Sequence, residues 1–213
     1  MSRARRILGL VRNELPGTEL CKDLLVVQPT EHILRGFAIE TTTEKDRIYL
    51  WRVVMPLYRP WRYVILDYSD RIFLKSGADI YLADTYKESA SLICSLISDH
   101  KRYLQDIRRP EDFLRHVGRM IGNDTINFRF TLALTYFRIG KVRECREILQ
   151  ALDVDVAQRD RTYFVKHGIK THTDDQIKRA MREIGENPQE FARLLDRWEA
   201  DNLRTLGLQA SRL

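Results

Sequence analysis

The feature that most constrains the fold is a strand-like run from Ile33 to Phe73, followed by a second half without comparable strand patterning. Tyr, Trp, Val and Ile, which favour strands, are dense in this first part. After residue 84 the apolar period changes from 2 to 3.6, which indicates helices. The sequence therefore predicts an α+β protein with a β-rich module over 1–83 and an α-helical module over 84–213. The alternative is one continuous domain.

The first module is expected to be an N-terminal antiparallel β-meander, because short connections between neighbouring strands favour that pairing. A short helix and a short strand over 24–27 lead into it. The second strand of the meander is almost continuously apolar, which suits a central strand covered on both faces. The expected strands of the meander are 33–41, 47–55 and 62–69.

The second module is expected to hold about six helices in antiparallel hairpins. Capping residues, prolines and glycines give their ends. The strongest start is Asn187-Pro188-Gln189-Glu190, which supplies an N-cap, a proline at the first helical position and a glutamate at the third. The expected helices are 84–105, 110–121, 124–140, 142–152, 173–185 and 188–206.

One pair of these helices, in the stretch LALTYFRIGKVRECREIL, has a pattern of residue types that is typical of two closely packed antiparallel helices. The pattern places small, aromatic, turn and large apolar residues where two helices approach closely, at Leu132, Ala133, Tyr136, Gly140, Cys145 and Leu149. The segment 124–152 therefore resembles a single tetratricopeptide-type hairpin. Arg129 stands where that family usually has a large aromatic residue, and the flanking helix pairs do not match. The resemblance implies a local helical hairpin and not a repeat array.

Composition bounds the class of protein. The net charge is +6 over 213 residues, and three scattered cysteines make a poor disulfide framework. Reduced thiols favour a cytoplasmic location, and no apolar run is long enough to cross a membrane. No glycine-rich phosphate loop and no nucleophile elbow is present, so the sequence predicts no cofactor.

Acidic and histidine pairs are the candidates for metal or catalytic chemistry. Glu40, Asp67 and Asp70 lie at expected strand ends, where metal-dependent nucleases place carboxylates. Asp67 and Asp70 read equally well as turn residues. His167 and His172 are close in sequence, but spacing alone does not make a metal site. The sequence therefore assigns no catalytic residue and no metal ligand.

The best surface candidate is a turn that interleaves arginine with aromatic residues: Tyr58, Arg59, Trp61 and Arg62. Such residues dominate binding hot spots, and the same mixture stacks on nucleic-acid bases. The alternative is that the aromatic rings fold back over the sheet edge. A second candidate is the N-terminal basic face with Arg3, Arg5, Arg6 and Arg12, which would suit phosphate or an acidic protein, or would simply be solvated.

Three functional interpretations follow. The first is a non-enzymatic protein-interaction module that binds another protein, by analogy with bacterial accessory, adaptor or toxin-neutralising (immunity) proteins of this size. The second is a basic nucleic-acid-binding protein that uses the N-terminal arginines and the arginine–aromatic turn. The third is a metal-dependent hydrolase or nuclease, which requires Glu40, Asp67 and Asp70 to converge in space. The oligomeric state is open in all three.

Overall fold

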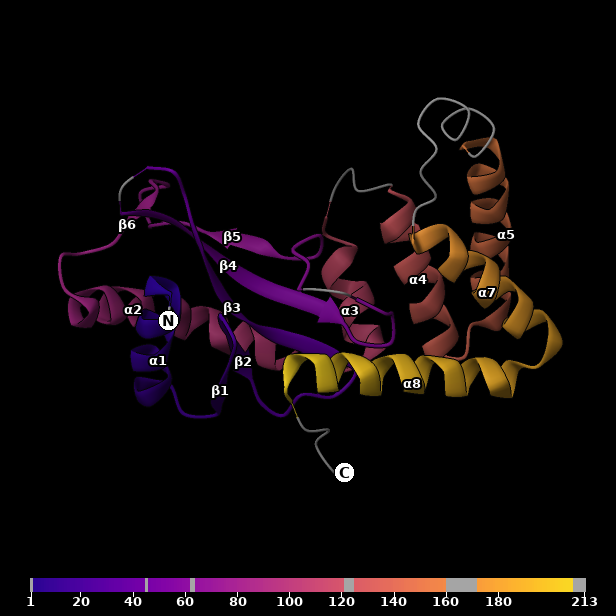
Figure 1. The fold of residues 1–213 in the computed structure, drawn as a ribbon, viewed down its shortest axis with the longest axis horizontal. Coiled ribbons are helices and arrows are strands. Elements are labelled where there is room, and N and C mark those ends of the chain that lie inside the picture. The colour runs from indigo at the N-terminus through magenta and orange to yellow at the C-terminus, as the bar shows by residue number, and fades with distance from the viewer. Residues whose placement is uncertain (1, 45, 62–63, 121–124, 160–171, 209–213) are drawn as a thin grey trace.

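The computed structural model describes residues 2–44, 46–61, 64–120, 125–159 and 172–208. An antiparallel sheet forms in the first part and helices follow it, which confirms the α+β prediction (Figure 1). The strands pair in the order β1-β2-β3-β4-β5, and β6 pairs with β4 beyond this path. Their bounds are β1 (Thr18–Cys21), β2 (Leu24–Val27), β3 (Ile33–Thr41), β4 (Arg47–Pro56), β5 (Asp70–Ile72) and β6 (Ile80–Tyr81).

Most of the expected helices begin at or close to their predicted positions, because their caps are local in sequence. Asn187 caps α8 as predicted, and its side chain accepts a hydrogen bond from the backbone N–H of Gln189 at 3.0 Å. No helix in the described part of the chain has the length and apolarity needed to cross a lipid bilayer. The helices are α1 (Arg3–Glu14), α2 (Tyr86–Gln105), α3 (Pro110–Val117), α4 (Ile126–Arg138), α5 (Val142–Arg159), α7 (His172–Glu186) and α8 (Pro188–Leu206).

The third strand of the expected meander is misplaced. Residues 64–69 are not a strand, and the short strand β5 pairs with β4 in their place. Tyr68 is buried in this segment, and its ring lies edge-on to Phe113 of α3 at 5.2 Å between centroids. Packing against helices therefore outweighs the alternating strand pattern. The sheet also begins earlier than expected, with the β1–β2 hairpin.

The two faces of the sheet are covered differently. On one face, Ile48, Leu50 and Val54 of β4 belong to the core cluster that includes the buried residues of α1 and α2. On the other face, the end of α8 covers only part of the sheet, where Leu203 packs in a cluster with Met55. The expectation that β4 is covered on both faces therefore holds for its second half but is wrong for its first half. Figure 1 shows α8 running from the helical group back to the sheet.

The predicted helical hairpin is formed by α4 and α5, joined through Gly140 in the left-handed conformation (φ 80°). Ala133, Cys145 and Leu149 are buried between helices. Arg129, which departs from the tetratricopeptide pattern, forms an ion pair with Asp155 at 2.5 Å. The arrangement is a helical hairpin, and the likeness to the tetratricopeptide family rests on the sequence alone.

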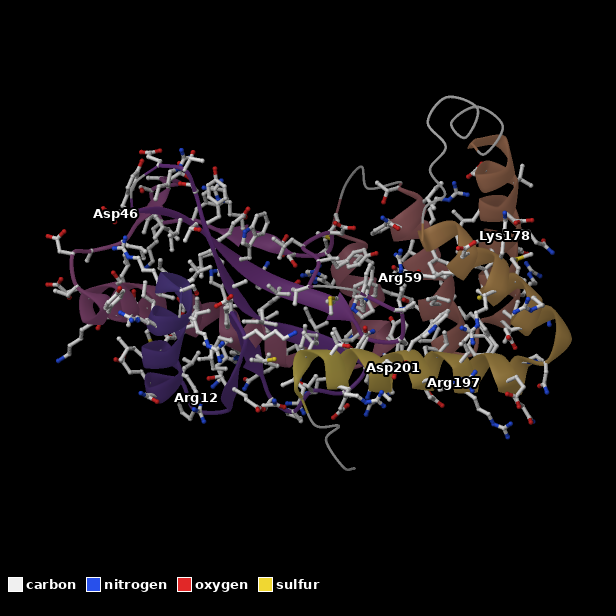
Figure 2. The ribbon with its side chains drawn as sticks, in the orientation of Figure 1. Arg12, Asp46, Arg59, Lys178, Arg197 and Asp201 are labelled. Atoms are coloured by element: carbon white, nitrogen blue, oxygen red, sulfur yellow. The ribbon has the colours of Figure 1, made fainter. Side chains whose placement is uncertain are left out.

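The sheet and the helices share one cluster of buried residues that extends from Ala4 of α1 to Trp198 of α8. Buried polar contacts also cross between them at Arg59, which lies where the sheet meets the helices (Figure 2). The division into modules at residues 83 and 84 stays a prediction, and both parts contribute to this shared core.

Candidate functional site: an open sheet face

The predicted binding turn is largely buried. Tyr58 is inaccessible to solvent, and its hydroxyl is hydrogen-bonded to Thr135 Oγ1 at 2.7 Å. The Arg59 guanidinium donates to the backbone oxygen of Asn127 at 2.7 Å and to its side-chain oxygen at 2.6 Å. Burial lowers the pKa of Arg59 to about 10. An exposed hot spot at these two residues is therefore a wrong prediction, because α4 takes up both side chains.

The remaining two residues of that turn differ from each other. Trp61 is half-buried, its indole N–H donates to the Pro56 carbonyl at 2.7 Å, and the Arg59 guanidinium lies 4.2 Å from its ring centre. The fold-back alternative describes Trp61 better than the hot-spot interpretation does. Arg62 lies outside the described residues.

The N-terminal arginines remain mostly available. Arg3 is half-buried and forms an ion pair with Asp46 in the turn before β4. Arg5, Arg6 and Arg12 are exposed on α1. Since one of the four predicted residues is committed to an internal ion pair, the basic face is smaller than expected.

The predicted acidic site is not supported. Asp70 forms an ion pair with Arg52 at 2.7 Å, and Glu40 accepts a hydrogen bond from the Trp51 indole. Across the described ranges, no group of three His, Cys, Asp or Glu side chains could hold a metal ion. Of the histidine pair, His172 begins α7 and His167 lies outside the described residues.

The structure instead presents an open face of the sheet that was not among the predicted sites. Alternate residues of β4 point to opposite faces, so Ile48 and Leu50 enter the core while Tyr49 and Trp51 stay half-exposed on the other side. Strand pairing places further side chains beside them. We call this surface the open face; it consists of Glu40, Arg47, Tyr49, Trp51, Arg71, Phe73 and Tyr81.

A stacked arginine organises the centre of the open face. The Arg71 guanidinium lies 3.7 Å from the ring centre of Tyr49 and 4.7 Å from that of Phe73. Asp79 accepts a hydrogen bond from Arg71 and forms an ion pair with Arg47 at 2.5 Å. A cation over an aromatic ring at an exposed site contributes about 0.5–1 kcal/mol. These contacts fix the orientation of the Tyr49 and Phe73 rings.

The edges of the open face are held by hydrogen bonds to carboxylates. The Trp51 indole N–H donates to Glu40 at 2.9 Å. The Tyr81 hydroxyl donates to Glu44 at 2.8 Å, and this bond raises the pKa of Tyr81. The same bond, together with one from Arg47, lowers the pKa of Glu44. Both polar ends are therefore oriented while the rings remain accessible.

The charge on and around the open face does not suit a polyanion. Two arginines, Arg47 and Arg71, pair with Glu44 and Asp79, and Glu40 adds a third carboxylate beside Trp51. Nucleic-acid binders concentrate positive charge along the phosphate path. Large apolar exposure is nevertheless present, since Phe73 is 46% and Tyr81 50% exposed. Aromatic area with charges of both signs is typical of protein-binding surfaces.

A clue to this face was present in the sequence. Arg47, Tyr49 and Trp51 alternate with Ile48 and Leu50, which is the pattern of a strand with one uncovered face. An apolar strand that contains a tryptophan need not be buried, because an indole whose N–H already has a hydrogen-bond partner, as Trp51 has in Glu40, can lie at the surface. No family model matches the chain, and neither a curated protein nor a solved structure matches it.

Proposed function

We propose that this protein is a non-enzymatic interaction module that binds another protein through the open face. The observation that carries the proposal is the stack of Tyr49, Arg71 and Phe73, which is ordered by Asp79 yet accessible. Rigid aromatic and arginine side chains lose little conformational entropy on binding, and they dominate measured binding hot spots. The mixed charge of the open face favours a partner surface that is itself apolar with charges of both signs.

The test compares capture of a partner from native lysate by matched variants. Phe73→Ala and Tyr81→Ala remove exposed rings from the open face. Tyr86→Ala is the control, because Tyr86 is 41% exposed at the start of α2 and lies outside the open face. We expect the wild type and Tyr86→Ala to capture the same protein at high salt after nuclease treatment, and both face variants to lose it.

Three results would contradict the proposal. Equal capture by the face variants would place the binding site elsewhere. Equal loss in Tyr86→Ala would show a general effect of removing exposed rings. Failure of the wild type to retain any stoichiometric protein would remove the basis for a protein partner.

Nucleic-acid binding is the second candidate, and the exposure of Arg5, Arg6 and Arg12 on α1 favours it. Its distinguishing result is co-purified nucleic acid that is lost at high salt, because phosphate contacts weaken steeply with salt. Replacing these three arginines with glutamine would then abolish the binding, while Phe73→Ala would not.

A further inference from the structure

A pocket lies between the end of α2 and α3, away from the open face. Its volume is about 230 Å³, and its walls include Tyr103, Ile107 and His116. A water molecule in the liquid occupies about 30 Å³, so the space would take a molecule the size of an amino acid. Tyr103 contacts Arg52 of β4. Because neighbouring residues of a strand point to opposite faces, Arg52 points to the helix-covered face and Trp51 to the open face.

The aromatic wall of the pocket is held rigidly. His116 is buried, and its Nε2 lies 2.8 Å from the Tyr68 carbonyl, which can only accept. Nε2–H therefore donates, and in the neutral imidazole Nδ1 accepts from the Tyr103 hydroxyl at 2.9 Å. Burial lowers the pKa of His116, which favours this neutral form. The Arg52 guanidinium lies 4.2 Å from the Tyr103 ring centre.

Four charged side chains line the pocket, and two of them are committed to each other. Asp112 accepts hydrogen bonds from the backbone N–H groups of Arg108 and Arg109 at the start of α3, and it also pairs with Arg115. Asp106 and Arg119 are exposed, and neither forms an ion pair within the described ranges. One negative and one positive group are therefore left to meet a ligand.

We infer that this pocket binds a small zwitterion, a molecule that carries a carboxylate and an ammonium group on one short frame, such as a free amino acid. Its carboxylate pairs with Arg119 and its ammonium with Asp106, while its body packs on Tyr103 and Ile107. A bare anion of the same size would lie against the unpaired charge of Asp106, and a bare amine against that of Arg119. The site is independent of the open face and of the proposed protein partner.

The test is calorimetric titration of the full chain with the common free amino acids. Each one that binds is compared with its amide, which lacks the carboxylate, and with its N-acetyl derivative, which lacks the ammonium. We expect at least one free amino acid to bind. Both of its blocked forms should bind at least about tenfold more weakly, since each loses a charged hydrogen bond.

Variants assign the binding to this pocket. Arg119→Gln and Asp106→Asn should each weaken binding about tenfold or more. Arg102→Gln is the matched control, because Arg102 is exposed on α2 and does not line the pocket. The inference is overturned if no free amino acid binds, if either blocked form binds equally well, or if Arg102→Gln weakens binding as much as Arg119→Gln.

Discussion

At the scale of single residues, Arg59 shows why a surface pattern can describe a buried side chain. Arginine beside aromatic residues is typical of hot spots, but here α4 supplies acceptors at Asn127 and Thr131. A buried guanidinium is tolerated when acceptors meet its donors, and both terminal nitrogens of Arg59 have acceptors on α4. Those acceptors lie far along the chain, so no local pattern near residue 59 could have predicted them.

His32 gives a pH-dependent prediction at the same scale. Its Nδ1 lies 2.9 Å from Glu199 of α8, and this hydrogen bond raises the pKa of His32. Glu31 and Arg138 also act on the ring, with opposite signs. A raised folded-state pKa stabilises the protein below the unfolded value of about 6.5. That contribution is lost as the pH rises through the folded-state pKa.

We therefore expect His32→Ala to lower the free energy of unfolding more at about pH 5.5 than at about pH 8.5. The loss at the lower pH should stay below about 1 kcal/mol, because the ring is partly exposed and solvent screens the pair. Urea denaturation at both pH values measures it. A larger deficit at the higher pH would contradict the sign.

At the scale of elements, prediction succeeded where the cause is local. Asn187 and Pro188 start α8 as expected, and Pro110 starts α3. The prediction of a third strand was wrong because Tyr68 packs on α3, and a local alternating pattern carries no information about that distant helix. The open face was missed for a related reason. How much of that side of β4 stays uncovered depends on where α8 ends on the sheet, and that is a property of the whole fold.

Two glycines with open space around them give a matched pair of predictions. A Cβ at either Gly140 or Gly185 would meet no atom within 4 Å, so only the backbone decides the effect. Gly140 has a φ of 80° between α4 and α5, and Gly140→Ala should cost about 1–2 kcal/mol. Gly185 lies within α7, and Gly185→Ala should stabilise by up to about 1 kcal/mol. Thermal unfolding of both variants measures these shifts, and equal signs would contradict the assignment.

At the scale of the whole molecule, α8 ties the helices to the sheet. The Asn202 side chain donates to the carbonyls of Leu57 and Arg59 and accepts from the backbone N–H of Trp61. Leu203 beside it packs in the cluster with Met55. Because the last helix closes on the first module, the two parts should unfold together despite their different patterning.

This coupling can be measured with one probe in each part. Replacing Trp61 and Trp198 with phenylalanine leaves Trp51 as a fluorescent probe of the sheet, and far-ultraviolet circular dichroism reports the helices. We expect the two urea transitions to coincide. Asn202→Ala should lower the free energy of unfolding by about 2 kcal/mol, because it leaves buried carbonyls unpaired, and both urea midpoints should move down together. Two separate transitions, with only one moved by Asn202→Ala, would instead show independent modules that meet near residue 84.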